Sequence, residues 1–391
     1  MIYELPTVAS GERAAVTRID ARRRDLRYYV AEPRRWVGSA RRVLAARAIQ
    51  GSNGIEGHNV SVEDAVAAIE GDDPTDARDE DWYAVTGYRR AMTYVLQLAQ
   101  DEHFTYTPSL LRSLHFMMTE YALDAGPGLW RPRGIWIRDD ATGAIVYEGP
   151  DHEDVPRLMD ELADQLARED DVPAMIRGAL AHLNLAMIHP FRDGNGRMAR
   201  CLQTLVLARE GILVPEFASI EEYLGANTQD YYDVLAHVGQ GAWNPSHDAR
   251  SWVRFCLKAH FVQATSVLRR VRESEQMWGE IEALLPASKL PDRAMAALYD
   301  TAVGLRVRNS GYRAVLKAWD EEISNQVATT DLGAMVRAGL LEARGKKRGA
   351  FYVAAGPLLE IQRRRVMGRQ PIDTADLFDP LPDPELSFGP A

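Results

Sequence analysis

The chain has 391 residues, of which 46% are hydrophobic and 26% are charged. This composition excludes a disordered or fibrous protein and favours two or three globular domains. The formal net charge of -10 opposes binding of a polyanion over the whole surface, so any contact with nucleic acid would have to be local. The first residues lack an export signal, no apolar run has membrane-spanning length, and Cys201 and Cys256 lack zinc-ligand spacing, so we expect a cytoplasmic protein without membrane contact.

The first 100 residues predict an N-terminal helical region. Residues 10–47 are rich in Ala, Arg and Leu, a pattern typical of helices. The glycines between Gly51 and Gly54 predict a break in the helical pattern. After it, Ser61 with an acidic residue three positions later predicts the capping box of a further helix.

Two more helices and a β-hairpin are expected next. Residues 82–100 and 108–121 have helical spacing, and the second stretch follows a threonine suited to be its N-cap. The periodicity then changes, because residues 134–138 and 144–148 are short runs rich in β-branched and aromatic residues on either side of turn residues. These two runs predict a hairpin.

A distinctive stretch lies between two further helices. Residues 173–188 place apolar side chains on one helical face, and a second helix beginning near Met198 should end before Gly211. The apolar positions of the first helix are Ile176, Ala179, Leu180, Leu183 and Met187. The stretch between the helices reads His189-Pro-Phe-Arg-Asp-Gly-Asn-Gly-Arg-Met-Ala-Arg200. It joins two helices, so part of it opens a helix.

The C-terminal part predicts a smaller domain. Helical pattern continues to about residue 282, and we treat residues 266–290 as a linker helix. Three helical segments and two short apolar runs then follow within residues 291–356, an order that resembles a winged helix. Prolines and aspartates become frequent after Ile361, so we expect residues 357–391 to form a docked or disordered tail.

Residues 189–200 combine the groups needed to bind and activate a phosphate ester. Unpaired amide groups at a helix N-terminus attract anions, and glycines let a phosphate approach the backbone closely. Arg197 and Arg200 lie on one helical face and can bind successive phosphates. Asp193 is a hard oxygen ligand suited to Mg2+, and His189 can accept a proton from a hydroxyl. A plain surface loop would explain any one of these residues, but not all of them together.

The same residues match the signature of the Fic family, His-Pro-Phe-x-[Asp/Glu]-Gly-Asn-Gly-Arg-x-x-Arg, at every fixed position. The resemblance implies that His189 is the general base that activates a Ser, Thr or Tyr hydroxyl for attack on the α-phosphate of ATP. It also implies that Asp193 binds Mg2+, that Arg197 binds the β-phosphate and that Arg200 binds the γ-phosphate. The phosphate oxygens would lie against Gly194, Asn195 and Gly196.

A second element resembles one found in a class of autoinhibited Fic proteins. The stretch from Ser52 to Gly57 matches [Ser/Thr]-x-x-x-Glu-[Gly/Asn], whose glutamate pairs with the second arginine of the signature. The resemblance implies that Glu56 occupies Arg200, where a γ-phosphate oxygen would bind, so that resting activity is low. Gly54 would cost this helix about 1 kcal/mol relative to alanine, so we expect loose inhibition.

Two other regions are expected to meet the nucleotide. The hairpin corresponds to the flap of the family, which aligns a target segment by strand-like pairing and would place Ile135, Trp136 and Ile137 near ATP. The alternative is a hairpin with Trp136 in the core. Tyr231, or else Tyr232, resembles a tyrosine that contacts the base, although an aromatic pair is also common in a core.

These observations predict a mainly α protein: a Fic helical core over residues 101–265 with a β-hairpin flap, and a small winged-helix domain. The expected function is transfer of AMP from ATP to a hydroxyl of a target protein or of the protein itself, with a homodimer as a possible assembly. Alternatives are another Fic activity, such as removal of AMP, or a DNA-binding regulator with a nucleotide-sensing core. Residues 287–356 hold 11 basic and 7 acidic residues, but the presumed recognition helix, residues 323–338, has Arg337 as its one basic residue, so DNA binding by Lys346, Lys347 and Arg348 is not favoured.

Overall fold

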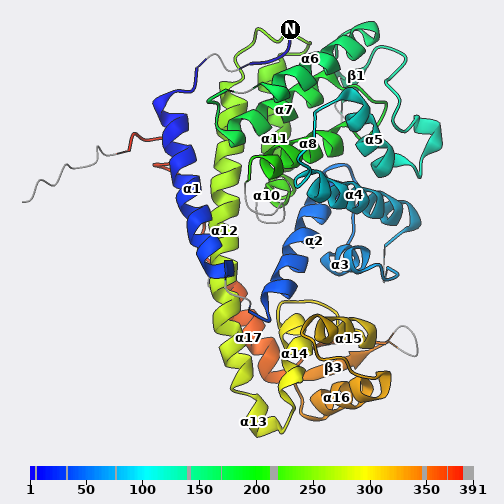
Figure 1. Cartoon of the computed structure of the whole chain (residues 1–391), viewed down its shortest axis with the longest axis vertical. Coiled ribbons are helices and arrows are strands. Elements are labelled where there is room, and N and C mark those ends of the chain that lie inside the picture. The colour runs from blue at the N-terminus through cyan, green and yellow to red at the C-terminus, as the bar shows by residue number, and fades with distance from the viewer. Residues whose placement is uncertain are drawn as a thin grey trace, which may run out of the picture.

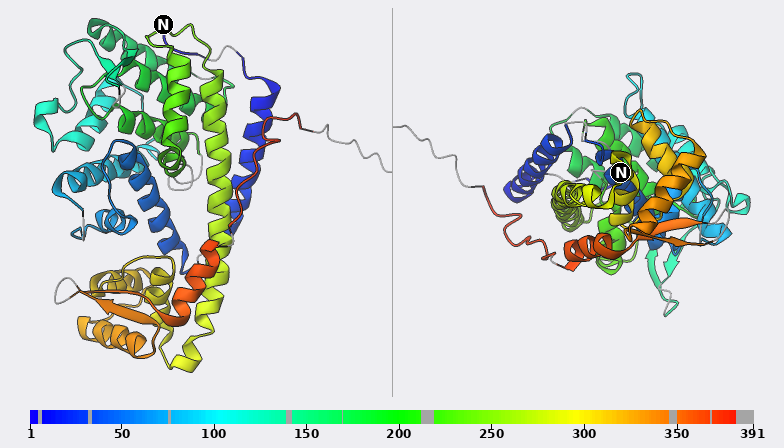
Figure 2. Two further views of the ribbon diagram at one scale, coloured as in Figure 1. Left: turned by 180° about the vertical axis from the view of Figure 1, so that it is seen from behind. Right: turned by 90° about the horizontal axis from the view of Figure 1, so that it is seen from below.

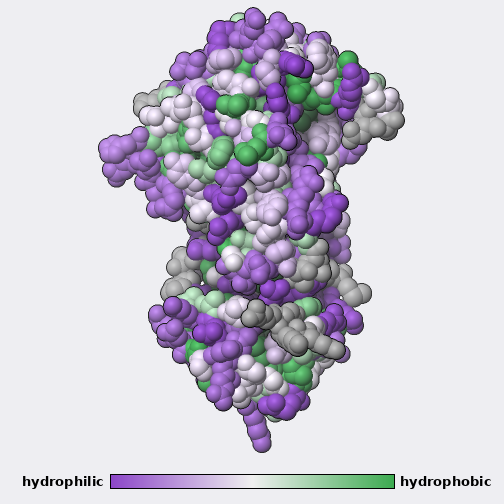
Figure 3. Space-filling view, turned by 90° about the vertical axis from the view of Figure 1, so that its right-hand side faces the viewer, coloured by the Kyte–Doolittle hydropathy of each residue, from purple (hydrophilic) through white to green (hydrophobic). Residues whose placement is uncertain are grey.

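The computed structural model describes residues 1–4, 7–31, 34–74, 77–138, 142–168, 170–211, 219–345, 350–367 and 369–381. Within these residues the chain is largely helical and has two small antiparallel sheets, which confirms the predicted mainly α class. None of the helices described here combines the length and the apolar composition that crossing a bilayer requires. Hydrophilic residues dominate the face shown in Figure 3, where hydrophobic residues form small separate spots.

A wide upper body and a smaller lower domain are joined by one long helix, α12 (Arg250–Glu282), with α1 (Ser10–Ala31) packed along it (Figure 1). Because α12 is continuous, the boundary predicted between residues 265 and 266 lies inside a helix. The other helices of the upper body that the structure describes are α2 (Val37–Ile55), α3 (Val62–Glu70), α4 (Asp79–Leu98), α5 (Pro108–Thr119), α6 (Val155–Ala167), α7 (Ala174–Ile188), α8 (Asn195–Arg209), α10 (Glu221–Ala226) and α11 (Thr228–Gly239), with 3-10 turns at η1 (Leu123–Ala125) and η2 (His152–Asp154).

Helix α7 is the centre of the upper body. The five apolar positions predicted for its buried face are all buried, and most of its other side chains are buried as well. It packs closely against α8, which is itself buried on nearly every side. The stretch between these two helices is therefore anchored at both ends in the core.

The break predicted at Gly51 to Gly54 is wrong, because α2 continues through it to Ile55. The glycines serve packing instead. A Cβ atom at Gly51 would lie 2.5 Å from the carbonyl oxygen of Glu221 in α10, and one at Gly225 would lie 2.7 Å from the Cα of Gly51. The two helices thus cross at a distance that only glycine permits.

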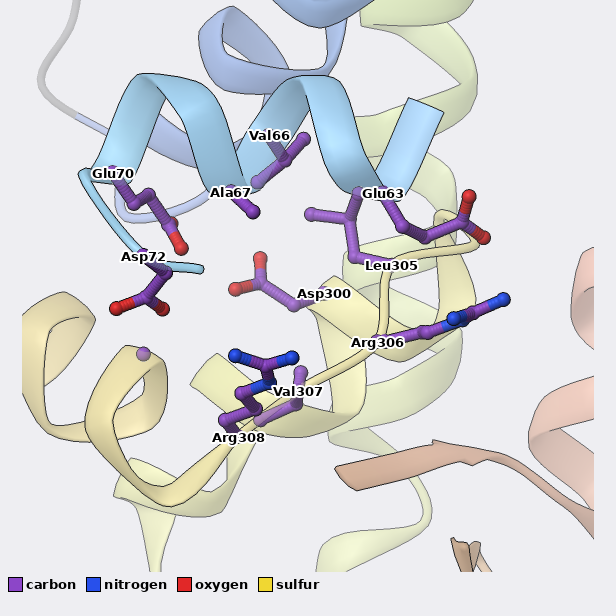
Figure 4. Close-up of a pocket in the computed structure, with 11 residues that line it drawn as sticks. Glu63, Val66, Ala67, Glu70, Asp72, Asp300, Leu305, Arg306, Val307 and Arg308 are labelled. Carbon is purple, nitrogen blue, oxygen red and sulfur yellow. The ribbon is translucent and has the colours of Figure 1, made fainter. Parts of the chain in front are cut away.

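Helix α2 also reaches the lower domain. Trp36, Val37 and Leu44 are buried in the core of that domain. In the same half of α2, Arg42 forms ion pairs with Asp300 at 2.9 Å and with Glu70 in α3 at 3.2 Å. Figure 4 shows the small polar pocket beside these residues, where carboxylates of α3 and of the loop after it face Asp300 of the lower domain.

The hairpin is present as predicted, with β1 (Trp136–Arg138) antiparallel to β2 (Ile145–Glu148) and Ile137 opposite Tyr147. The lower domain also has the predicted order of elements, and its assignment as a winged helix stays a prediction. Its elements are α13 (Leu285–Ser288), η3 (Asp292–Ala294), α14 (Met295–Ala302), α15 (Asn309–Ala318), α16 (Asn325–Arg337), β3 (Leu341–Arg344) and β4 (Phe351–Ala354). Residues 346–348, the basic residues considered for DNA contact, lie outside the described residues.

The first part of the expected tail is helical. Residues Gly356–Met367 form helix α17, which buries Leu358 and Ile361 in the lower core. Beyond it, residues 369–381 run back along α1, as Figure 2 shows, and Arg18 donates hydrogen bonds to the carbonyl oxygens of Leu377 and Asp379. The described part of the tail is therefore docked, both by buried apolar side chains and by hydrogen bonds from Arg18.

The crossing of α2 with α10 predicts opposite effects for two alanine substitutions in α2. Gly51→Ala should lower stability by about 1–3 kcal/mol, because the added Cβ overlaps backbone atoms of α10. Gly38→Ala, on the exposed side of the same helix with no atom within 4 Å of the added Cβ, should raise it by about 0.5–1 kcal/mol. Thermal unfolding monitored by circular dichroism measures both. Equal effects of the two substitutions would contradict a close crossing.

Candidate functional site

The loop between α7 and α8 has a sharply defined backbone. Helix α7 ends because His189 adopts a left-handed conformation, with φ 51° and ψ 58°. This conformation costs a non-glycine residue roughly 1–2 kcal/mol, so surrounding contacts must hold it. Gly194, with φ 75°, makes the second left-handed turn and begins α8. The loop therefore presents the first turn of α8 next to His189.

Side chains inside the loop fix its shape. Asn195 is buried, its Oδ1 accepts a hydrogen bond from the backbone N–H of Phe191, and its Nδ2 donates to the carbonyl oxygen of Phe191, both at 2.9 Å. The side chain of Asn195 is therefore engaged within the loop, and only its backbone N–H can face an anion. Phe191 is fully buried and anchors the loop in the core.

His115 in α5 supports the loop from behind, and no feature of the sequence singled it out. Its ring stacks on Phe191 with the ring centres 3.6 Å apart. Its Nδ1 accepts a hydrogen bond from the N–H of Gly128, so its Nε2 carries the proton and donates to the carbonyl oxygen of Asp193 at 2.8 Å. Burial lowers the pKa of His115 to about 4, so this ring is neutral at physiological pH.

His189 has the geometry of a general base. Its Nδ1 lies 3.2 Å from the carbonyl oxygen of Ala186, an acceptor, so the proton sits on Nδ1 and Nε2 is the basic nitrogen. Burial lowers the pKa of His189, which outweighs the opposite effect of the Ala186 carbonyl. The imidazole is therefore neutral at physiological pH and able to take up a proton.

Asp193 and Arg197 lie beside the first turn of α8. The side chain of Asp193 is 54% exposed, and a terminal nitrogen of Arg197 lies 3.4 Å from its carboxylate. Arg197 is buried and donates a further hydrogen bond to the hydroxyl of Tyr121. An accessible carboxylate next to a helix N-terminus fits a hard divalent cation bound together with an anion.

Arg200, the second arginine of the loop, is 1% exposed and is held by helix α2. Its Nε donates to the hydroxyl of Ser52 at 2.7 Å, and one terminal nitrogen donates to the carbonyl oxygen of Ser52 at 2.9 Å and to the carboxylate of Glu56 at 2.8 Å. Although burial disfavours a charged guanidinium, the Glu56 carboxylate raises the pKa of Arg200 above its ordinary value. The structure thus brings together the two residues whose pairing the resemblance to the Fic family implies.

The carboxylate of Glu56 also covers the first turn of α8. A Cβ atom built on Gly196 would lie only 2.2 Å from Oε1 of Glu56, so the carboxylate rests directly on that glycine. Glu56 is placed there by the end of α2, where Gly57 has φ 83° and the N–H of His58 donates to the carbonyl oxygen of Asn53. Gly57 is required because few other residues adopt this conformation.

The flap lies at the edge of the site. Trp136 is 50% exposed and donates a hydrogen bond to the Glu148 carboxylate, so it is not a core residue. Ile137 on the same strand and Ile135 just before it are partly buried. On the opposite strand, Tyr147 is buried and its hydroxyl donates to the carbonyl oxygen of Met187, two residues before His189. The hairpin is therefore tied to the end of α7.

The two candidate tyrosines have different environments. Tyr231 is 2% exposed, and its hydroxyl donates to Nε2 of the buried His182, so its ring belongs to the core. Tyr232 is 46% exposed and its hydroxyl lies 3.4 Å from the carbonyl oxygen of Ile55, next to Glu56. Because Tyr231 is buried, its ring is not accessible to a nucleotide base. Tyr232 is the accessible ring of the pair.

Known proteins resemble this chain in the region that contains the loop. Residues 105–207 match the Fic/DOC family. These residues are a Fic domain. A 175-residue part of the chain, 44% of its length, is 27% identical to a protein adenylyltransferase Fic of Nematostella vectensis, covering 36% of that protein. A 143-residue part, 36% of the chain, is 27% identical to a probable protein adenylyltransferase of Aquifex aeolicus and covers 42% of it. The chain thus spans about two-fifths of the length of these relatives.

Solved structures show the same fold. A Fic family protein from Desulfovibrio desulfuricans is similar over 90% of this chain and 99% of its own, with a TM-score of 0.56 and 22% identity. Fic-1 from C. elegans is similar over 67% of this chain and 73% of its own, with a TM-score of 0.52 and 19% identity. The likeness to the Desulfovibrio protein includes most of the chain outside the Fic domain.

The neutral histidine behind the Fic domain loop predicts a pH dependence of stability. In the unfolded chain His115 has its ordinary pKa of about 6.5, whereas the folded value is about 4, so stability is complete above pH 6.5 and falls as the pH drops toward 4. The loss from this one residue should approach 1.4 kcal/mol per pH unit in that window, to order of magnitude.

Chemical denaturation at several pH values tests this. The slope of unfolding free energy against pH should be smaller in His115→Gln than in wild type, whatever the absolute stability of the variant. His103→Gln, a substitution of an exposed histidine, is the control and should keep the wild-type slope. An unchanged slope in His115→Gln would show that His115 is not buried as a neutral ring.

Proposed function

We propose that this protein is an adenylyltransferase that moves AMP from ATP to a hydroxyl group of a protein and is inhibited at rest by Glu56. The observation that carries the proposal is the position of the Glu56 carboxylate, which lies on Gly196 and pairs with Arg200 at the N-terminus of α8. An anion-binding site filled by an internal carboxylate is suited to a phosphate when the carboxylate leaves. The relatives named protein adenylyltransferase support the reaction type.

The reaction follows from the groups of the loop. The target hydroxyl gives its proton to Nε2 of His189 while its oxygen forms a bond to the α-phosphorus of ATP. The bond from that phosphorus to the bridging oxygen of the β-phosphate breaks, and pyrophosphate leaves. The backbone N–H groups of Gly194, Asn195 and Gly196, together with Arg197, stabilise negative charge on the phosphates. Most of the rate enhancement would come from positioning and charge.

The residues present fit a bound Mg2+ ion. Asp193 offers an accessible carboxylate at the edge of the phosphate-binding turn, and a divalent ion there would neutralise charge on the α- and β-phosphates. His115 holds the backbone of Asp193 in place through its carbonyl oxygen. The carboxylate is therefore presented by a fixed backbone.

Inhibition follows from competition for Arg200. When Glu56 is in place, its carboxylate pairs with the guanidinium of Arg200 and fills the space next to Gly196, so a γ-phosphate cannot bind at either place. ATP then binds only in the fraction of molecules from which Glu56 has moved away, which lowers its apparent affinity by that fraction. Ser52 keeps two hydrogen bonds to Arg200 and so holds this side chain in position in either state.

Radioactive labelling tests the reaction and its inhibition together. With ATP labelled at the α-phosphate, Glu56→Gly should modify itself much more strongly than wild type, and with ATP labelled at the γ-phosphate neither should be labelled. His189→Ala in the Glu56→Gly background should lose labelling while it still binds ATP, measured by calorimetry. Equal labelling of wild type and Glu56→Gly would rule out inhibition by Glu56, and transfer of the γ label would rule out AMP transfer.

The strength of inhibition should depend on the last turn of α2. Gly54 lies within this turn and has no atom closer than 4.0 Å to an added Cβ, so Gly54→Ala is accommodated. It should stabilise the turn by about 1 kcal/mol, which corresponds to about fivefold weaker apparent binding of ATP and a similar fall in self-modification.

Calorimetric titration with ATP and Mg2+ measures the change in affinity. Gly38→Ala, at the other end of the same helix, should leave ATP affinity unchanged and serves as the control. Tighter ATP binding by Gly54→Ala than by wild type would contradict inhibition through a helical last turn.

A further inference from the structure

We propose that Arg131, which stands between the first helices and the flap, is a positioning residue that holds the flap and the catalytic loop together as one unit. Arg131 lies outside the loop signature. Its contacts attach the flap to the loop that carries His189. The proposal deepens the proposed function, since it concerns how a target hydroxyl is aligned with His189.

The guanidinium of Arg131 joins three separate segments. Its Nε donates to the carbonyl oxygen of His189 at 2.9 Å. One terminal nitrogen donates to the carbonyl oxygen of Arg133 at 2.7 Å, where the chain enters the flap. The other donates to the carbonyl oxygen of Pro150, where the chain leaves the flap. A planar side chain with donors in a fixed fork can hold three carbonyl groups at defined directions, which lysine cannot.

The backbone of Arg131 adds a fourth contact with the loop. Its N–H donates to the carbonyl oxygen of Pro190 at 2.8 Å. Arg131 thus binds the carbonyl oxygens of two successive loop residues, His189 and Pro190. These contacts hold His189 in its left-handed conformation, and the side chain of Arg131 is buried with all of its nitrogens hydrogen-bonded.

The two ends of the flap also meet each other at this place. The N–H of Gly149 donates to the carbonyl oxygen of Ile135, and a Cβ atom on Gly149 would lie 2.7 Å from the side chain of Ile135. The entry and exit strands are therefore in direct contact above Arg131. A change in the angle of the flap must move the carbonyl oxygen of Pro150, and with it the guanidinium that holds His189.

The charge of Arg131 acts on His189 as well. Burial is the main cause of the lowered pKa of His189, and the Arg131 guanidinium lowers it further, whereas the carboxylates of Glu56 and Asp193 act in the opposite direction. Arg131 is thus placed to orient the histidine and to favour its neutral form. A target strand seated on the flap would be aligned with Nε2 of His189 through this one side chain.

Hydrogen exchange followed by mass spectrometry tests the coupling without relying on any activity. In Arg131→Gln and in Arg131→Lys, peptides covering residues 133–150 and 187–194 should both exchange faster than in wild type. Arg112→Gln, which removes a neighbouring arginine bound to the carbonyl oxygen of Gly128, is the matched control and should leave the flap peptides unchanged. Faster exchange in only one of the two segments, or in neither, would overturn the proposal.

Kinetics in the Glu56→Gly background separate the effect of the positive charge of Arg131 from the effect of its hydrogen bonds. Arg131→Gln and Arg131→Lys should both lower kcat for self-modification, on the order of 10²-fold, because His189 would no longer be held at the correct distance from the target hydroxyl. The acidic limb of the rate profile should move to higher pH in Arg131→Gln but stay in place in Arg131→Lys, which keeps the charge. An unmoved limb in Arg131→Gln would refute the charge effect.

If the Glu56→Gly protein transfers no AMP at all, the proposed function fails, while the hydrogen-exchange result still decides whether Arg131 couples the flap to the loop.

Discussion

The buried guanidinium of Arg200 is the constraint on which the rest of the site depends. One of its terminal nitrogens makes no hydrogen bond to any residue that the structure describes, and the other two nitrogens are held by Ser52 and Glu56. Removing the partner of a buried charge costs about 3–5 kcal/mol, so the protein is more stable with an anion beside Arg200 than without one. Glu56 supplies this anion in the structure, and a phosphate would supply it in the proposed reaction. The matched residues 105–207 do not contain α2, so the Fic domain depends on a helix outside its own boundaries.

Helix α2 joins the two parts of the molecule through contacts of very different kinds. Its first half is buried in the core of the lower domain, its middle crosses α10 at Gly51, and its last turn carries Glu56. A rigid tilt of α2 would break all three sets of contacts, whereas unwinding beyond Asn53 would move Glu56 and leave the first two intact. Local opening of a helix end costs far less than the separation of a core. The position of Glu56 at the end of the helix, one residue before Gly57, is therefore compatible with a site that opens while the domains stay packed.

The loop could be predicted from the sequence because a short run of residues carries its chemistry, whereas its pairing with Glu56 could be expected only from the resemblance of residues 52–57 to the inhibitory element of the Fic family. Other features could not be read in this way, since they depend on contacts between distant segments. Gly51 was interpreted as a helix breaker, but only the approach of α10 shows why glycine is needed there. His115 and Arg131 act through backbone carbonyl groups far away in the sequence, and such partners leave no pattern in the chain. Helix α17 was missed because a few buried residues, among them Leu358 and Ile361, outweigh the polar and proline-rich composition around them.

Three histidines in or near the loop show why a lowered pKa alone does not identify a catalytic group. Burial lowers the pKa of His115, His182 and His189, so all three rings are neutral at physiological pH. In His115, Nε2 donates to the carbonyl oxygen of Asp193, and in His182 it accepts a hydrogen bond from Tyr231, so neither ring has a nitrogen left for a substrate. His189 differs, because its one hydrogen bond among the described residues uses Nδ1 and leaves Nε2 as an acceptor. His189 also differs in its place, because it follows the last residue of α7 and has a left-handed backbone, whereas His115 and His182 lie inside helices.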